Sequence, residues 1–153
     1  MEQLRLDTAF FAERGETGIN STSTAMLALL LVGLGQESEA AQLLPRARAL
    51  AARDDFATLV YIDQAEARVA SASGNHDAAL AAVDDAWQHL EQTDYLNLKA
   101  DTRRIRGDVL HAAGRDADAD AEFDHALAMY EAKGNVADVR RHLEHRQRSG
   151  GPA

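Results

Sequence analysis

The chain has 153 residues, a formal net charge of −9 at pH 7, and 46% hydrophobic against 27% charged residues. This length and balance predict one globular domain with a buried core, and the negative charge argues against nucleic acid or an anionic membrane surface as a partner. Cysteine is absent, which excludes disulfides, thiolate metal sites and cysteine nucleophiles and favours a reducing, cytoplasmic setting.

Helix-forming residues dominate the composition, because 31 Ala and 18 Leu stand against only 17 Val, Ile and Thr combined. Apolar spacing, caps and turn residues predict eight helices along the chain. In chain order they span residues 2–14, 21–34, 37–52, 56–73, 76–92, 96–113, 116–132 and 136–148. The sequence therefore predicts an all-α protein.

The longest apolar run, Ala25 to Leu34, has ten residues, about half of the ~20 that a membrane-spanning helix needs. The polar segment STST precedes it and no positively charged segment leads into it, so it does not match a signal peptide. We expect a buried helix here, capped at its N-terminus by Ser21, Thr22 or Ser23. No membrane segment is expected.

A repeat of about 40 residues is the strongest pattern in the chain. Gly35, Gly74 and Gly114 stand 39 and 40 residues apart. Small or apolar residues follow each glycine at five, nine and twelve positions: Ala40, Ala79 and Ala119, then Leu44, Val83 and Phe123, then Ala47, Ala86 and Ala126. Matching columns precede the glycines: Met26, Ala65 and Ile105, then Ala28, Ala67 and Gly107, then Leu30, Val69 and Val109. The spacing within each segment places these residues on one face of a helix.

Each repeat unit thus consists of a helix, a turn at glycine and a second helix, and a period of this length is typical of a solenoid. We expect a single domain over residues 1–148, built as a right-handed stack of three helical hairpins with a helix at each end. The units span about 21–55, 56–95 and 96–135, the helix at 136–148 closes the stack, and residues 149–153 form a disordered tail.

The spacing of a small residue, a turn glycine, Ala, a larger apolar residue and Ala resembles the tetratricopeptide repeat (TPR), best kept in RGDVLHAAGRDADADAEFDHAL over 106–127. The longer period is similar to the C-terminal repeats of large bacterial signalling ATPases, including adenylate-cyclase-related and antibiotic-regulator-like transcriptional activators. GETGINSTSTA (15–25), ARALAARDD (47–55) and ALAMYEAKGNVADVRR (126–141) carry that likeness. The resemblance implies an α-α superhelix that serves as a sensory or scaffold segment in bacterial signalling, with relatives tethered to enzymatic and DNA-binding domains.

Three residues depart from a regular helical repeat. Asp63 and Arg103 stand early in first helices, where the resemblance implies aromatic residues. Pro45 lies inside the predicted helix at 37–52, where it lacks an N–H and its ring clashes with the carbonyl of Ala41. The sequence therefore predicts a kink or break at Pro45.

Motifs for catalysis or metal binding are incomplete. The alternating acids from Asp116 to Asp124 imitate a calcium loop, but Ala121 replaces its glycine and Leu127 its bidentate glutamate. The favourable position of acids in the first turn of a helix explains Asp116 and Asp118 without a metal. His142 and His145 lack a third ligand at a suitable spacing, which favours a solvated helix surface. We expect no enzymatic activity and no cofactor or metal.

In the second and third repeat units, polar residues at helical spacing form a stripe beside the apolar face of the unit's first helix. We call this set the first-helix stripe; it comprises Tyr61, Gln64, Arg68, Ser71, Asp101, Arg104, Asp108 and His111. In tetratricopeptide solenoids this flank faces the concave groove, so the resemblance implies that the stripe binds a protein or peptide, or other domains of a larger signalling protein. The alternative is a solvated flank in which Arg104 merely pairs with Asp101 or Asp108.

Two other functions remain open at this point. The stripe's counterparts in the first unit are mostly apolar (Thr22, Ala25, Leu29 and Val32), and the first helix offers Leu4, Leu6, Phe10 and Phe11 to cover them. If this flank or the end helix pairs with a second copy, the protein is a self-associating homodimer. A small-ligand sensor would require an enclosed pocket lined by Tyr61, Gln64, Arg68 and Arg104. The arginines of the last helix are expected to form a polar cap rather than a nucleic-acid contact.

Overall fold

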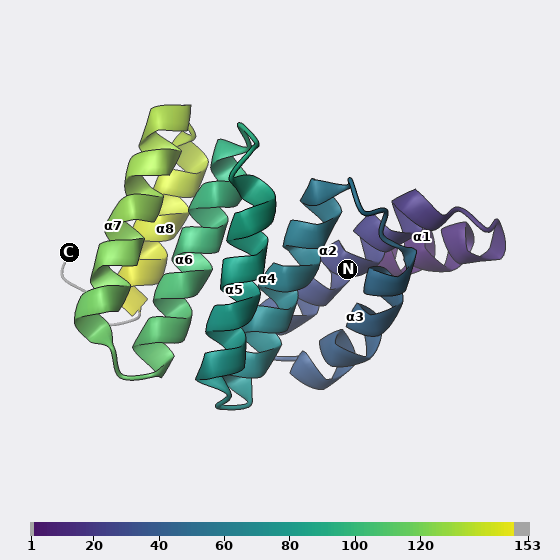
Figure 1. The fold of residues 1–153 in the computed structure, drawn as a ribbon, viewed down its shortest axis with the longest axis horizontal. Helices are drawn as coiled ribbons and strands as arrows, with labels where there is room; N and C mark the ends of the chain where they lie inside the picture. Colours follow the sequence, from purple (N-terminus) through teal and green to yellow (C-terminus); the bar gives the residue numbers. More distant parts are fainter. Residues whose placement is uncertain (1, 149–153) are drawn as a thin grey trace.

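The computed structural model describes residues 2–148, and these form eight α-helices and no strand (Figure 1). The helices are α1 (Glu2–Glu13), α2 (Thr17–Gly33), α3 (Glu37–Leu50), α4 (Phe56–Ala72), α5 (His76–Leu90), α6 (Leu96–Ala112), α7 (Asp116–Lys133) and α8 (Val136–Arg148). All eight predicted helices are present. None of those in the described range is long and apolar enough to cross a membrane. The tail predicted at 149–153 lies outside the described residues.

The start of α2 corrects the prediction for the first unit. The helix begins at Thr17 rather than at residue 21, so the expected N-cap at residues 21–23 is wrong. Ser21 lies inside the helix and is buried, and its hydroxyl donates to the carbonyl of Ala47 on α3 at 2.8 Å. A serine that resembles a cap in the sequence therefore serves as a bond between two helices.

Pro45 lies inside α3 without ending it, so of the predicted kink or break the break is wrong, and the kink stays a prediction. The proline and Ala41, whose carbonyl loses its intrahelical donor, are both exposed. Water can therefore hydrate this carbonyl, which removes the need for the helix to stop.

Glycines form the tight corners between helices. Gly35, Gly74 and Gly114 have φ angles of 73°, 77° and 75°, the left-handed region that glycine adopts without strain. At each corner the glycine N–H bonds to the carbonyl three residues back, and the next N–H bonds to the carbonyl five residues back. This is the Schellman arrangement, which satisfies the free carbonyls at a helix end. Gly134 repeats the same pair of bonds between α7 and α8.

The helices pack mainly against their neighbours in the chain, and α1 and α8 lie at opposite ends of the molecule (Figure 1). The first helices α2, α4 and α6 form a continuous row, because α4 contacts both α2 and α6. Each second helix packs on its own first helix, and α3 and α5 also contact the first helix that follows. The protein is therefore an all-helical, repeat-like stack.

Small residues allow the two helices of each hairpin to approach closely. Ala28, Ala67 and Gly107 occupy the same column of the repeat, and all are buried. At Gly107 the approach is closest, because a Cβ atom there would lie 2.5 Å from Cε1 of Phe123 on α7. The phenylalanine ring occupies the space of a Cβ atom, so a larger residue at position 107 would force the ring to shift.

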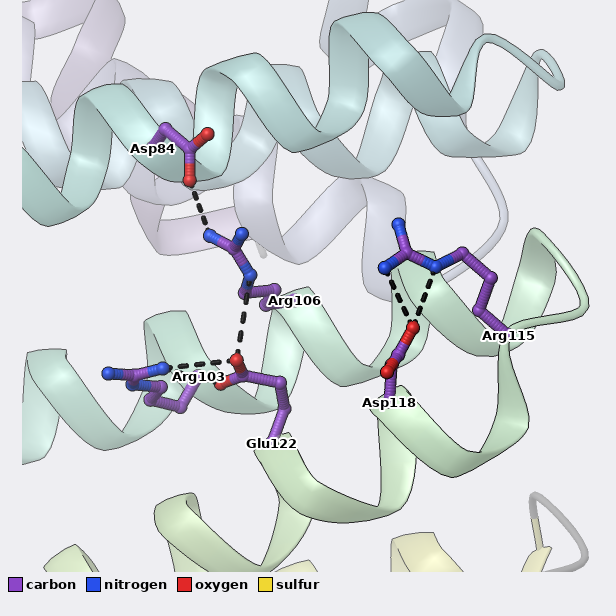
Figure 2. Close-up of polar contacts among 6 residues, drawn as sticks. All are labelled: Asp84, Arg103, Arg106, Arg115, Asp118 and Glu122. Carbon is purple, nitrogen blue, oxygen red and sulfur yellow. Dashed lines mark hydrogen bonds and ion pairs between the residues drawn. The ribbon is translucent and has the colours of Figure 1, made fainter.

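Charged residues hold α5, α6 and α7 together along one side (Figure 2). Arg106 on α6 bonds to Asp84 on α5 and lies 3.6 Å from Glu122 on α7. Arg103 donates to the same glutamate at 2.9 Å, and its guanidinium stacks over the Trp87 ring at 4.2 Å. Arg103, which departs from the repeat pattern, thus has partners on both neighbouring helices.

Candidate functional site

The α4 half of the first-helix stripe is largely packed within the molecule. Gln64 is buried, and its Nε2 donates to the hydroxyl of Thr102 on α6 at 2.9 Å. Tyr61 is half-buried against the apolar cluster that joins α2, α3 and α4, and Ser71 is half-buried as well. Gln64 therefore joins α4 to α6 and offers little surface to a partner.

Arg68 is the charged residue in the α4 half of the stripe, and no ion pair within residues 2–148 neutralises its charge. Its side chain is half-buried and forms no hydrogen bond or ion pair with another described residue. Burial lowers the pKa of Arg68, the Arg104 cation lowers it further, and the carboxylates of Asp108 and Asp101 act in the opposite direction. Two guanidiniums are thus held near each other on adjacent first helices.

The α6 half of the stripe forms a polar network with α7 and α8. The Tyr130 hydroxyl donates to Asp101 at 2.5 Å, and Arg104 donates to Asp108 at 3.3 Å. Nε2 of His145 lies 2.5 Å from the same Asp108 carboxylate. Burial raises the pKa of Asp101, while the hydrogen bond from Tyr130 lowers it. The pairing of Arg104 with Asp108 is one of the two that the sequence analysis gave as the alternative to a binding role.

A polar pocket of about 220 Å³ opens where this network reaches the last helix. Residues from α6, α7 and α8 line it, among them Asp101, Arg104, Tyr130, Arg141, His142 and His145. Tyr61, Gln64 and Arg68, which the sensor hypothesis placed around one pocket with Arg104, do not line it.

His142 corrects the expectation of a solvated pair of histidines on the last helix. Its side chain is buried, with its ring centroid 5.9 Å from that of Phe123 and 5.8 Å from that of Tyr130. Burial lowers the pKa of His142, against the influence of the Phe123 backbone. Within residues 2–148, no group of three or more His, Asp and Glu side chains is placed to hold a metal ion.

His111 lies apart from the network, at the corner between α6 and α7. Its Nδ1 is 2.7 Å from a carboxylate oxygen of Asp116, the first residue of α7. Of the eight stripe residues, the structure therefore gathers Arg68, Asp101, Arg104 and Asp108, and places His111 in the contact between two helix ends.

Tyr130 is a functional candidate that the sequence analysis missed. It stands sixteen residues after Gly114, as Leu90 stands sixteen after Gly74, and both side chains are buried. The sequence contains one indication of this role, a tyrosine hydroxyl at a repeat position that is otherwise apolar. A buried hydroxyl requires a hydrogen-bond partner.

Three of the four arginines of α8 have acidic partners on α7 and α8. The ion pairs join Arg140 to Glu144, Arg141 to Asp138, and Arg146 to both Asp120 and Asp124. The outer helix thus presents a surface of mixed charge.

The apolar flank of the first unit is mostly covered. Ala25 and Val32 are buried and Leu29 is half-buried, while Leu4 of α1 packs against the same apolar cluster. Phe10 of α1, which the sequence analysis also expects to cover this flank, is 48% exposed.

The site combines cationic and anionic side chains from adjacent helices. The guanidiniums of Arg68 and Arg104 lie near the carboxylates of Asp101 and Asp108, which accept hydrogen bonds from Tyr130 and Arg104. Comparisons of this chain with protein-family models, curated proteins and solved structures return no match.

Proposed function

We propose that this chain is a TPR-like superhelix that binds an extended protein or peptide segment along the first-helix stripe and the adjoining pocket. The observation that carries the proposal is the half-buried guanidinium of Arg68, which forms no hydrogen bond or ion pair with another described residue, although the carboxylates of Asp108 and Asp101 act on it from a greater distance. A half-buried charge without a partner is costly, so a ligand that pairs with it gains binding energy. Such a role suits a docking segment of a signalling protein.

The chemistry of Arg68 defines the partner. A guanidinium binds a carboxylate through two parallel N–H donors, so the segment is expected to carry Asp or Glu opposite Arg68. Beyond it, the pocket contains both acidic and basic side chains, which suits mixed polar residues. Because the chain carries a net charge of −9, a uniformly acidic partner would be repelled, and one or two acidic residues fit best.

A displayed library of random peptides tests the proposal. Selection on the wild-type chain should enrich peptides with Asp or Glu, and Arg68→Gln should weaken their binding by roughly tenfold or more, since charged hydrogen bonds contribute about 1.5–3 kcal/mol. Arg115→Gln is the matched control, because Arg115 is exposed, does not belong to the stripe and pairs with Asp118 (Figure 2). Selected peptides that lack acidic residues, or that bind wild type and Arg68→Gln equally, would contradict the proposal.

A further inference from the structure

The second helix presents an apolar face to solvent. Ile19, Met26 and Leu30 are 53%, 40% and 42% exposed, and Leu34, directly after the helix, is 56% exposed. Their spacing of seven, four and four residues places them on one side of α2. The exposed apolar residues of the described chain are concentrated at this end of the stack, where Leu6 and Phe10 of α1 are also exposed.

The repeat indicates what such a face normally contacts. In α4 and α6 the positions of Met26 and Leu30 are occupied by Ala65, Val69, Ile105 and Val109. The residues in α4 belong to or pack against the cluster with α2 and α3, and those in α6 belong to the cluster with α4 and α5. These positions therefore contact the preceding helical hairpin in α4 and α6, whereas in α2, on which α1 alone packs from that side, Met26 and Leu30 remain exposed.

Charge identifies which surface can occupy this position. No Asp, Glu, Lys or Arg occurs between Thr17 and Leu34, so the net charge of −9 resides elsewhere in the chain. The opposite end of the stack is closed by α8, whose exposed residues include Arg140, Arg141 and Glu144. Contact of α2 with that end would remove charges from water, whereas contact with a second α2 would remove none.

We infer that two copies of this chain associate through the exposed faces of α2, with the two helices antiparallel across a two-fold axis. Met26 lies near the middle of the exposed row from Ile19 to Leu34. An antiparallel arrangement therefore brings Met26 close to its own counterpart and Ile19 close to the partner's Leu34. A two-fold interface uses the same patch on both copies, which an uncharged apolar face permits.

Molar mass in solution tests this inference directly. Light scattering across a concentration series should give twice the chain mass of 16.6 kDa for the wild type and the single-chain mass for Met26→Glu. Leu143→Glu is the matched control, because Leu143 is 43% exposed on α8 and lies at the other end of the stack; this variant should remain dimeric. A wild type that stays at the single-chain mass at every concentration would overturn the inference, as would a Met26→Glu variant that stays folded and dimeric.

Cross-linking tests the geometry without relying on a disruptive variant. The chain has no cysteine, so Met26→Cys introduces one thiol near the proposed axis and Leu143→Cys introduces one thiol of similar exposure away from it. Under mild oxidation, Met26→Cys should form a covalent dimer much faster than Leu143→Cys. Equal rates would contradict the α2 interface. Met26→Glu should retain peptide binding and Arg68→Gln should retain the dimer mass, so failure of this inference is distinguishable from failure of the proposed function.

Discussion

The carboxylate of Asp63 shows how a charged residue is accommodated in the core. Its side chain is 1% exposed, and one oxygen lies 2.5 Å from a guanidinium nitrogen of Arg48 on α3. The other oxygen has no hydrogen-bond partner within the described residues and lies 3.6 Å from Nε2 of His89. Burial raises the pKa of Asp63 to about 6, although Arg48 acts in the opposite direction. The ion pair therefore compensates only part of the cost of burying the charge.

Because its pKa is raised, Asp63 is expected to lower the stability of the folded protein as pH rises. Between about pH 4 and pH 6 the unfolded chain loses this proton first, so the free energy of unfolding falls as pH increases, and the loss is complete above the folded-state pKa. Asp63→Asn keeps the shape and removes the titration. The difference in free energy of unfolding between Asp63→Asn and wild type should favour the variant by roughly 2–3 kcal/mol more at pH 7 than at pH 4.

Urea unfolding of wild type and Asp63→Asn at several pH values measures this difference. Asp54→Asn, in the exposed segment before α4, controls for the loss of one negative charge. A constant difference between wild type and Asp63→Asn across the pH range would contradict the prediction.

At the scale of elements, the contact between α6 and α7 depends on the fit of Gly107 to Phe123. Equivalent pairs in the other hairpins are Ala28 with Leu44, and Ala67 with Val83. A smaller residue on one helix thus accompanies a larger one on the other, which keeps the volume between the helices filled.

Gly107→Ala should destabilise the protein by about 1–3 kcal/mol through overpacking, even though alanine is the better helix former by about 1 kcal/mol. The reason is that the new Cβ atom would lie 2.5 Å from the Phe123 ring. In a Phe123→Val background, which reproduces the pair of the second hairpin, the same substitution should become neutral or stabilising. A double-mutant cycle from urea unfolding measures this coupling.

Gly33→Ala serves as the control for the helix-propensity effect, because a Cβ atom at Gly33 would have no neighbour within 4 Å. It should leave stability unchanged or increase it slightly. The packing argument fails if Gly107→Ala behaves like Gly33→Ala.

At the scale of the whole molecule, contacts between neighbouring helices carry the structure. In the middle of the stack, α4 and α6 contact helices on both sides. At the two ends, α1 packs mainly against α2 and α8 packs mainly against α7 (Figure 1). In such a stack each hairpin gains most of its stability from the units beside it, so the ends open more readily than the middle.

Amide hydrogen exchange should therefore be slowest in α4 and α6 and fastest in α1 and α8. Mass spectrometry of exchanged peptides gives the protection of each helix. Gly107→Ala should accelerate exchange in α6 and α7 more than in α2 and α3, because the perturbation acts on nearest neighbours first. Uniform protection along the chain, or an equal response in all hairpins, would indicate one fully cooperative unit instead.

The sequence predicted the helices well because their signals are local. Glycine at 35, 74 and 114 marks the left-handed corners, and the period of the small residues marks the faces that pack. The candidate site was predicted only in part. Spacing placed Arg104 beside Asp108, but it gave no indication that Tyr130 and His145 join them from α7 and α8. Contacts between helices far apart in the chain depend on how the hairpins stack, which helix periodicity does not contain.

By itself, the sequence determined the all-helical architecture, the order of the helices and the positions of the corners, since propensity, capping and backbone conformation act over a few residues. Only the tertiary structure decided which side chains are buried and which face remains open. His142 is polar yet buried, and Met26 is apolar yet exposed, because burial depends on whether a neighbouring helix is present. The end of a stack exposes the same face that its middle covers.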